Sequence, residues 1–340
     1  MRITEKSFGK LYGKDIPLFE IENTNGISFS ACPYGAVLVS VITPDRDGKF
    51  DCITLKLSSI EGYTQDNPYF GATVGRVANR ISDAAFTVND SRYTLEQNDG
   101  NNHLHSGKSG ISKKLWNIEQ ASSDEGIIFQ CESPDKEGGY PGNVQFSCKY
   151  KLTEENELII EYSAETDKAT PINMTNHSYW NLSGDPTKAV LDHTLQINSR
   201  YYLPKTQHGL PTGEVLRTEN TLFDFTKEKR LENSEIMLSS GLDHCYIVSS
   251  DKEVFSRITH PFSGRRMMMS TESPGVHVYT GNWLNTFGNI ENTHFPRFGG
   301  ICLEPEELPN AVNIRHFPSI ILQPGEQYSR KTRIRFDTLH

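Results

Sequence analysis

The sequence lacks the features that mark several classes of protein. No apolar run approaches the ~20 residues that a membrane-spanning helix needs, and residues 1–20 contain no apolar stretch of signal-peptide length. Positive charge is in deficit, because 34 Lys and Arg against 43 Asp and Glu give a net charge of −9. This balance argues against nucleic acid or an anionic membrane as a partner. We therefore expect a cytoplasmic protein whose ligand is neutral or small and polar.

Paired cysteines and domain boundaries are also absent from the sequence. The six cysteines are scattered without any C-x-x-C pair, and most of them adjoin apolar residues typical of strands. This pattern predicts buried free thiols rather than disulfides or a metal site. No linker, low-complexity tract or fixed-period repeat interrupts the chain, so we expect residues 1–340 to form a single domain.

Three common functional motifs are incomplete. The segment GKS at residues 107–109 ends like a phosphate-binding loop, but Asn102 occupies the place of the first glycine. No serine stands in a G-x-S-x-G elbow. His103 and His105 form an H-x-H pair that could point to one face of a strand as metal ligands do, yet no glutamate follows at the spacing of a cupin-type site. We expect no metal and no organic cofactor.

Short stretches with a two-residue alternation are abundant. Turn clusters of Gly, Pro, Asn and Asp separate these predicted strands, which include residues 36–42, 126–133, 144–150, 157–163, 191–197, 243–249 and 331–336. Helical patterns are few, and residues 58–66 and 227–238 are each predicted to contain a short helix. Regular strand spacing without strand–helix alternation predicts an all-β protein, a large antiparallel β-sandwich with few short helices.

Residues 175–184, TNHSYWNLSG, are too polar for an ordinary piece of hydrophobic core. In an extended segment, His177 and Tyr179 share one face while Trp180 points to the other. This alternation indicates that His177 and Tyr179 line a pocket and that Trp180 packs behind them. The alternative is a core histidine with satisfied hydrogen bonds.

Residues 299–313, GGICLEPEELPNAVN, contain the strongest carboxylate candidate. Glu304 lies at the end of a predicted strand, and Pro305 is expected to keep it extended while ending the strand. The apolar neighbours of Glu304 favour a functional role. We expect Glu306 and Glu307, which follow at once, to be solvated loop acids.

Residues 71–82, GATVGRVANRIS, contain a further group of polar candidates. Asn79 and Arg80 are adjacent and offer amide and fork-shaped donors for the hydroxyl groups of an uncharged ligand. We expect Arg76 to belong to a solvated basic surface. Asp243, at the start of another predicted strand, is a turn or capping residue or a ligand-binding carboxylate.

Several ordered blocks together resemble the galactose mutarotase (aldose 1-epimerase) family. They span roughly residues 70–328 and read GRVANRI, NHLHSG, TNHSYWNLSG, LPTGE followed by FDF, GLDH, PGVHVYTGNWL, GICLEPE with PNAVN, and ILQPGEQY. The resemblance implies the large antiparallel β-sandwich of that family, in agreement with the predicted strands.

The resemblance also implies roles for individual residues. His177 would be the general acid and Glu304 the general base, and the sugar-binding residues would be Asn79, Arg80, His105 and Asp243. His277 stands where the family commonly has glutamine, and Glu306 stands where the family often has glutamine. We count His277 among the binding residues and expect these departures to affect which pattern of hydroxyl groups is accepted.

The chemistry of anomer exchange asks for such a set. A base removes the proton of the anomeric hydroxyl while an acid protonates the ring oxygen, and each positioned proton transfer typically contributes ~10²–10⁴ in rate. A carboxylate suits the base, whereas a histidine needs negative neighbours to remain protonated at neutral pH. We expect Asp243 to supply that negative field to His177.

The sequence therefore predicts an aldose 1-epimerase that interconverts the α and β anomers of a free aldose, galactose or glucose, as a monomer or homodimer. Two alternatives remain open. A hexose-6-phosphate 1-epimerase would need extra arginines for the phosphate, for which Arg265 and Arg266 are adjacent candidates. A non-catalytic carbohydrate-binding sandwich would need no acid–base pair.

Overall fold

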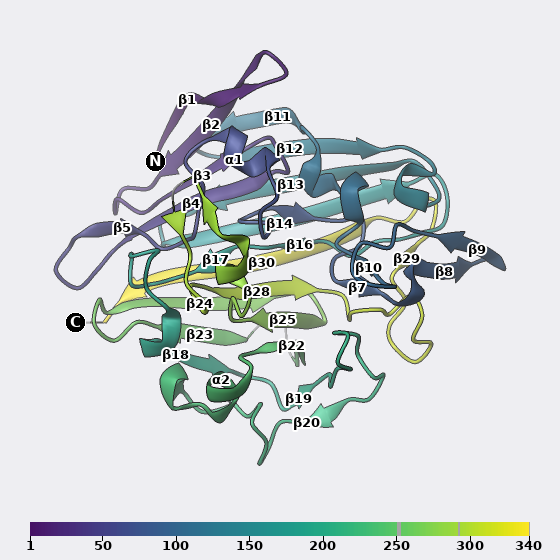
Figure 1. The fold of residues 1–340 in the computed structure, drawn as a ribbon. Helices are drawn as coiled ribbons and strands as arrows, with labels where there is room; N and C mark the ends of the chain where they lie inside the picture. Colours follow the sequence, from purple (N-terminus) through teal and green to yellow (C-terminus); the bar gives the residue numbers. More distant parts are fainter. Residues whose placement is uncertain (250–252, 292, 340) are drawn as a thin grey trace.

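Three large antiparallel sheets form the body of the computed structural model, which describes residues 1–249, 253–291 and 293–339 (Figure 1). The largest is a nine-stranded sheet. In sheet order its strands are β11 Asn117–Ser122, β12 Gly126–Ser133, β13 Val144–Leu152, β14 Glu157–Thr166, β30 Tyr328–Thr338, β24 Arg265–Thr271, β23 Ser256–Thr259, β18 Thr194–Ile197 and β21 Lys229–Arg230. Buried residues alternate with more exposed ones along β13 and β14, as the two-residue sequence period predicts. The all-β antiparallel prediction is therefore confirmed.

The six-stranded sheet has one apolar and one polar face. Its strands, in sheet order, are β17 Tyr179–Trp180, β28 Ile301–Glu306, β25 Gly275–Tyr279, β22 Asp243–Ile247, β19 Tyr201–Tyr202 and β20 Leu216–Arg217. Apolar side chains such as Val278 and Leu303 point from one face into the largest core cluster, which also contains Phe129 and Phe146 of the nine-stranded sheet. Burying each such side chain contributes ~1.5–3 kcal/mol. The opposite face is left for polar residues.

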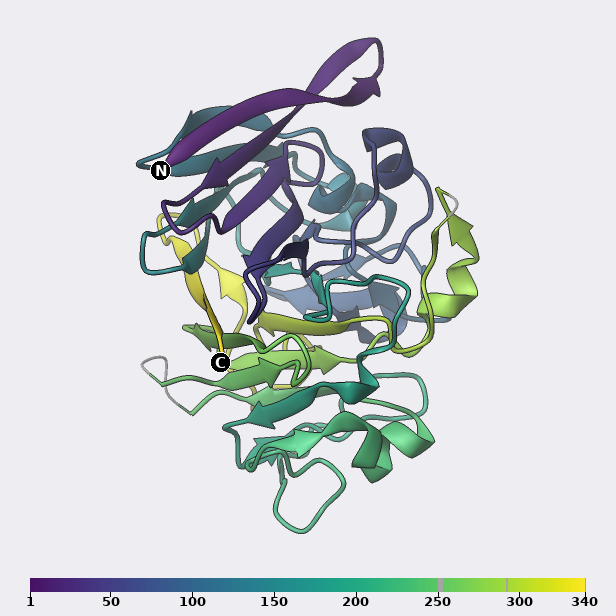
Figure 2. The ribbon, with the colours of Figure 1, turned by 90° about the vertical axis from the view of Figure 1, so that its left-hand side faces the viewer.

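The five-stranded sheet forms one end of the molecule. Figures 1 and 2 show it in purple, with the region around α2 (green) at the other end. Its strands follow chain order: β1 Arg2–Leu11, β2 Lys14–Glu22, β3 Ser28–Cys32, β4 Val37–Pro44 and β5 Phe50–Cys52. The predicted strand at residues 36–42 is β4, whereas the mostly exposed β1 lacks an apolar alternation and was not predicted.

Short strand pairs and turns connect the sheets. The pairs are β6 Thr73–Val74 with β16 Thr175–Asn176, β7 Arg80–Ile81 with β10 His103–Leu104, β8 Ala85–Val88 with β9 Ser91–Thr94, β15 Thr170–Pro171 with β29 Ile321–Leu322, and β26 Asn289–Ile290 with β27 Thr293–His294. The 3₁₀ turns are η1 Ser82–Ala84, η2 Gly107–Ser109, η3 Ile111–Lys113, η4 Glu137–Gly139, η5 Val190–Asp192, η6 Leu231–Asn233 and η7 Leu284–Phe287.

α1 Ile60–Thr64 lies within the predicted helical segment 58–66, and α2 Glu235–Ser239 overlaps the predicted segment 227–238 and ends one residue beyond it. Within the described ranges, no helix has the length and apolar character needed to cross a membrane. All six cysteines are unpaired thiols, and five of them are buried. The prediction of free thiols is thus confirmed, with Cys52 only partly buried.

The prediction that Arg76 is solvated is wrong. Its side chain is 2% exposed. The guanidinium donates hydrogen bonds of 2.8–2.9 Å to the carbonyl oxygens of Ser133, Pro134, Pro141 and Gly142. A buried guanidinium with its donors satisfied avoids the cost of an unpartnered charge, so Arg76 fastens the loop between β12 and β13.

Candidate active site

One cavity of about 210 Å³ on the outward face of the six-stranded sheet contains all of the predicted site residues. The side chains that line it come from distant parts of the chain. They are Asn79, Arg80, His105, His177, Tyr179, Asp243, His277 and Glu304, together with Pro68, Tyr69, Leu104, Tyr279, Trp283 and Phe287.

Strand register places the polar side chains of this face. β25 pairs with β28 so that His277 lies directly opposite Glu304, while Asp243 begins the neighbouring β22 and lies opposite Tyr279. These strands run side by side in Figure 1. Because alternate residues point to one face, the apolar partners of the same strands fill the core and the polar residues face the cavity.

His177 lies between the short strands β16 and β17. Its backbone N–H donates to the carbonyl of Ala72 at 2.9 Å, and its carbonyl accepts from the N–H of Gly71 at 3.0 Å. Its ring lies 5.1 Å from the ring of Tyr179 and 5.9 Å from that of Tyr69. Backbone hydrogen bonds and aromatic neighbours thus fix the imidazole in the cavity wall, and Trp180 packs behind it in the core as predicted.

The imidazole of His177 faces the carboxylate of Glu304. The Nε2 and Oε2 atoms are 3.6 Å apart, and the two side chains are only 7% and 3% exposed. Burial and, to a smaller extent, the charge of Asp243 raise the pKa of Glu304 to about 8, although the charge of Arg80 opposes this rise. Burial also lowers the pKa of His177 to about 4. The pair therefore retains one proton across the neutral range.

Asp243 acts on a different partner from the one expected. The sequence predicted that its charge would hold a proton on His177, but one carboxylate oxygen accepts from His277 Nε2 at 2.8 Å and the other binds Lys205. Burial favours the neutral acid, yet the hydrogen bond from His277 and the charge of Lys205 outweigh it and hold the pKa of Asp243 well below its usual range. The electrostatic influence of Asp243 falls on Glu304.

The tautomer of His277 follows from Asn79. The Asn79 Oδ1 atom accepts the backbone N–H of Arg80 at 2.9 Å, so the amide nitrogen faces the other way. That nitrogen lies 3.1 Å from His277 Nδ1 and 3.1 Å from Glu306 Oε1. Because an amide nitrogen only donates, Nδ1 accepts and the proton of His277 lies on Nε2, toward Asp243.

His105 is oriented by the backbone of Asn79. The Asn79 N–H donates to His105 Nδ1 at 3.1 Å, and the His105 N–H donates to the Asn79 carbonyl at 3.1 Å. Both residues have left-handed backbones, with φ of +63° and +52°, a strained conformation that is common in binding sites. Burial holds the pKa of His105 well below its usual value, so the neutral ring carries its proton on Nε2.

The prediction that Glu306 and Glu307 are solvated is wrong. Their exposed fractions are 0% and 4%. β28 continues through Pro305 to Glu306, so the proline does not end the strand. Arg330 pairs with Glu307, whereas Glu306 Oε2 has no hydrogen-bond partner within the described ranges. Burial raises the pKa of Glu306 well above its usual value, so it is a buried neutral acid behind the cavity.

Several residues of the site were not predicted. Tyr279 and Trp283 occur in the block PGVHVYTGNWL, whose only predicted binding residue was His277. Tyr69 adopts a left-handed backbone with φ of +61°, a feature that its sequence context does not indicate. Lys205 lies in a loop and reaches Asp243 only through the fold.

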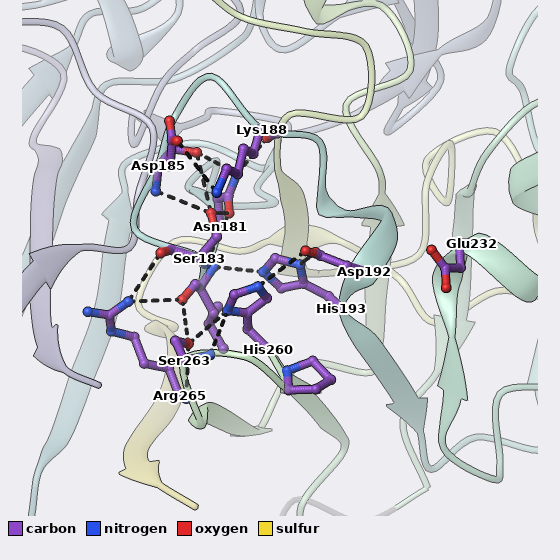
Figure 3. A network of polar contacts seen from close by, with 12 residues as sticks. Asn181, Ser183, Asp185, Lys188, Asp192, His193, Glu232, His260, Ser263 and Arg265 are labelled. Carbon is purple, nitrogen blue, oxygen red and sulfur yellow. Dashed lines mark hydrogen bonds and ion pairs between the residues drawn. The ribbon is translucent and has the colours of Figure 1, made fainter. Parts of the chain in front are cut away.

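A second cluster of imidazoles and a carboxylate lies outside the cavity (Figure 3). Asp192 accepts from His193 Nδ1 at 2.8 Å and from His260 Nε2 at 3.3 Å. The opposite ring nitrogens accept the backbone N–H groups of Leu182 at 2.9 Å and Ser263 at 3.2 Å. Both rings are therefore neutral donors to Asp192, and the cluster is a structural hydrogen-bond network.

Two groups of residues have the spacing of metal ligands. His105, His177 and Glu304 form one and Asp192, His193 and His260 the other, with their ligand atoms within 4.8 Å of one another. In each group at least one histidine accepts a hydrogen bond from a backbone N–H on the ring nitrogen that points away from the other ligands. The proton of that ring therefore lies on its other nitrogen, the one that would have to bind the metal. The donor chemistry therefore fits a metal poorly.

The two arginines considered as ligands of a phosphate group bind carboxylates outside the cavity. Arg265 is 2% exposed and donates to the carboxylate of Asp51 at 2.8 Å. Arg266 forms an ion pair with Asp337. Neither arginine lines the cavity, so these two arginines provide no phosphate site there.

Known proteins are similar to this chain in sequence and fold. The family model described as aldose 1-epimerase matches residues 17–335. The galactose mutarotase of Bos taurus is 38% identical over 307 residues, which cover 89% of each chain. The galactose mutarotase of Homo sapiens is 37% identical over 340 residues, which cover 98% of each chain.

A solved structure agrees with these matches. The aldose epimerase homologue from C. elegans superposes with a TM-score of 0.90 at 28% identity, covering 96% of this chain and 100% of that chain. A family match over nearly the whole length coincides with a cavity in which a buried histidine faces a buried glutamate. The chain belongs to the aldose 1-epimerase family and is an isomerase.

Proposed function

We propose that the enzyme interconverts the α and β anomers of a free aldose, with galactose and glucose as its substrates, and that Glu304 is the general base and His177 the general acid. The observation that carries this proposal is the 3.6 Å approach of the two buried groups inside one small cavity. An acid and a base this close can act on the two oxygens bonded to C1 of one sugar, the anomeric hydroxyl and the ring oxygen.

The reaction needs two coupled proton transfers. Glu304 takes the proton of the anomeric hydroxyl, the bond between C1 and O5 breaks, and His177 gives its proton to O5. The open aldehyde rotates about the bond between C1 and C2, and the reverse transfers close the ring on the other face. Every atom and proton is returned, so no cofactor is consumed.

The proton inventory of the pair suits this cycle. Before ring opening, one proton resides on His177 and none on Glu304, and after ring opening the distribution is reversed. The pair carries one proton in both states, which is the number expected between a pKa of about 4 for His177 and about 8 for Glu304. Substrate binding must move the shared proton toward His177, which a polar ligand in a buried site can favour.

The remaining polar side chains are proposed to hold the sugar hydroxyls. His105 presents an Nε2–H donor, and Asp243 presents carboxylate oxygens as acceptors. Arg80 is balanced by Asp99 at 2.7 Å, so its guanidinium offers donors without an excess charge. Tyr179, 2% exposed, forms part of the wall. Such a set recognises an uncharged sugar better than a phosphorylated one.

We further propose that the protein is cytoplasmic and acts as a monomer or homodimer without nucleic acid. The unpaired state of all six cysteines supports a reducing compartment, and the net charge of −9 disfavours phosphate backbones. Sedimentation velocity would test the oligomeric state, and a tetramer or larger assembly would contradict it.

Polarimetry tests the main proposal. Freshly dissolved α-galactose and α-glucose should approach their anomeric equilibrium much faster with the enzyme than in buffer alone. A rate equal to that of buffer for both sugars would overturn the proposed substrates.

A further inference from the structure

The thiol of Cys302 lies behind the imidazole of His177. Its Sγ atom is 3.7 Å from His177 Nδ1, while the other ring nitrogen, Nε2, lies 3.6 Å from Glu304 Oε2. Within the described residues, no other side chain forms a hydrogen bond with Nδ1. The proposed function uses Nε2 alone, so it gives Cys302 no role.

Strand register fixes the position of this thiol. β28 carries Cys302 and Glu304 two residues apart, so both side chains point to the same face of the six-stranded sheet. Cys302 pairs with Tyr179 of β17 and with Tyr279 of β25, and it is 0% exposed. One strand therefore presents the base to one nitrogen of His177 and the thiol to the other.

The sulfur of Cys302 is an uncharged partner for the ring. Burial and, to a smaller extent, the charge of Glu304 raise the pKa of the Cys302 thiol well above its usual value. A neutral thiol is a weak donor and a weak acceptor, unlike the carboxylate of Asp243 that binds His277. Because a weak acceptor stabilises an imidazolium less than a carboxylate does, the thiol leaves His177 a stronger acid.

The proposed proton cycle requires a hydrogen on Nδ1 of His177. Ring opening moves the proton of Nε2 to O5 and leaves a neutral imidazole whose hydrogen lies on Nδ1. When the ring closes, Nε2 must have a free lone pair to take the proton back from the O5 hydroxyl. The other neutral tautomer carries its hydrogen on Nε2 and cannot accept this proton.

A hydrogen-bond partner at Nδ1 selects between these tautomers. The carbonyl oxygen of His177 itself favours a protonated ring, but it already accepts the N–H of Gly71 at 3.0 Å. The sulfur of Cys302 is the side-chain atom placed to accept the hydrogen of Nδ1. Its position therefore favours the tautomer that the reaction needs.

We propose that Cys302 is a positioning residue for the general acid, because its sulfur accepts a hydrogen bond from His177 Nδ1 and so keeps Nε2 free to exchange a proton with the sugar. This inference rests on the proposed function, since it takes His177 to transfer protons through Nε2. It adds to that function a residue that does not line the cavity.

Nitrogen-15 NMR of the imidazole tests the hydrogen bond without depending on turnover, with the His177 signals assigned by their loss in His177→Asn. In the wild-type enzyme at pH 7, His177 should carry a hydrogen on Nδ1. In Cys302→Ala, part of the population should shift to the tautomer with its hydrogen on Nε2. A wild-type His177 without a hydrogen on Nδ1 would overturn the proposal even if Cys302→Ala does not fold. A tautomer ratio that Cys302→Ala leaves unchanged would also overturn it.

Steady-state kinetics separates this role from a general effect on the fold. Cys302→Ala should lower kcat for galactose about 3- to 10-fold, the value of one neutral hydrogen bond, with little change in KM because Cys302 does not line the cavity. Cys131→Ala is the matched control, since it removes a sulfur that is 4% exposed in the nine-stranded sheet, and it should leave kcat unchanged.

The outcomes of this comparison distinguish the two proposals. A kcat of Cys302→Ala equal to that of wild type, or an equal loss in Cys131→Ala, would overturn the role of Cys302. A wild-type enzyme that does not accelerate anomerisation would instead count against the proposed function.

Discussion

The Nε2 atom of His177 lies 3.6 Å from the Oε2 atom of Glu304, and both side chains are almost fully buried. This proximity makes the two groups a single titrating unit. Burial pushes both toward their neutral forms, and under the proposed mechanism the proton that remains is the one passed between enzyme and sugar.

The pH dependence of kcat/KM follows from this unit. Below a pH of about 4, His177 and Glu304 are both protonated, so the pair has no group that can act as the base. Above a pH of about 8, Glu304 loses the last proton and the acid is lost. Polarimetry across pH, with the buffer rate subtracted, should give a bell with a plateau between these limits. A rate that rises steadily through pH 9 would contradict a shared proton.

His277 is expected to position Asp243. His277→Ala removes the hydrogen bond that Asp243 accepts at 2.8 Å and should lower kcat/KM about 10- to 150-fold, the value of a hydrogen bond to a charged group. His277→Gln can still donate and is the matched control, with activity close to that of wild type. Equal losses in both variants would show that the imidazole itself is required.

Arg76 is expected to stabilise the fold without taking part in catalysis. Arg76→Met leaves the carbonyl oxygens of residues 133–142 without their donor and should reduce the free energy of unfolding by about 3 kcal/mol or more. Arg335, an exposed residue of β30, provides the control, and Arg335→Met should change stability by less than about 0.5 kcal/mol. Urea unfolding measures both variants. Equal unfolding midpoints for Arg76→Met and Arg335→Met would contradict a stabilising role for Arg76.

The network around Asp192 should make the folded state less stable as the pH falls. Burial lowers the pKa of His260 from 6.5 to about 4, so the unfolded chain takes up this proton first as pH falls. Stability is then complete above pH 6.5 and declines between pH 6.5 and 4. His260→Gln, which cannot titrate, should lose less Tm over this interval than wild type. If Tm falls by the same amount between pH 7 and 4.5 in wild type and in His260→Gln, this assignment is contradicted.

Sequence and structure agree most closely where local pattern is decisive. The strands β12, β13, β14 and β30 follow from alternation, and the ordered blocks of the sequence meet in one cavity. Partners distant in sequence could not be predicted in this way. Arg76 is buried because carbonyls more than fifty residues away accept its protons, and Glu306 is buried because β28 continues past a proline.

The charge environment of His177 was also beyond local reasoning. Asp243 was expected to supply a negative field to His177, but its carboxylate binds Lys205 and His277 instead. No spacing in the sequence relates these residues, since they meet only through the packing of a loop on β22. The sequence therefore grouped the residues that line this cavity but did not predict the partner of Asp243.

The anomerisation rate of Glu304→Gln tests the central claim most directly, with sugar binding measured on the same protein. The account predicts that the variant still binds galactose but loses at least about 100-fold in rate, and that His177→Asn with Glu304→Gln is little slower than either single variant, because the pair acts as a unit. A Glu304→Gln enzyme that binds galactose and equilibrates its anomers at the wild-type rate would contradict the account.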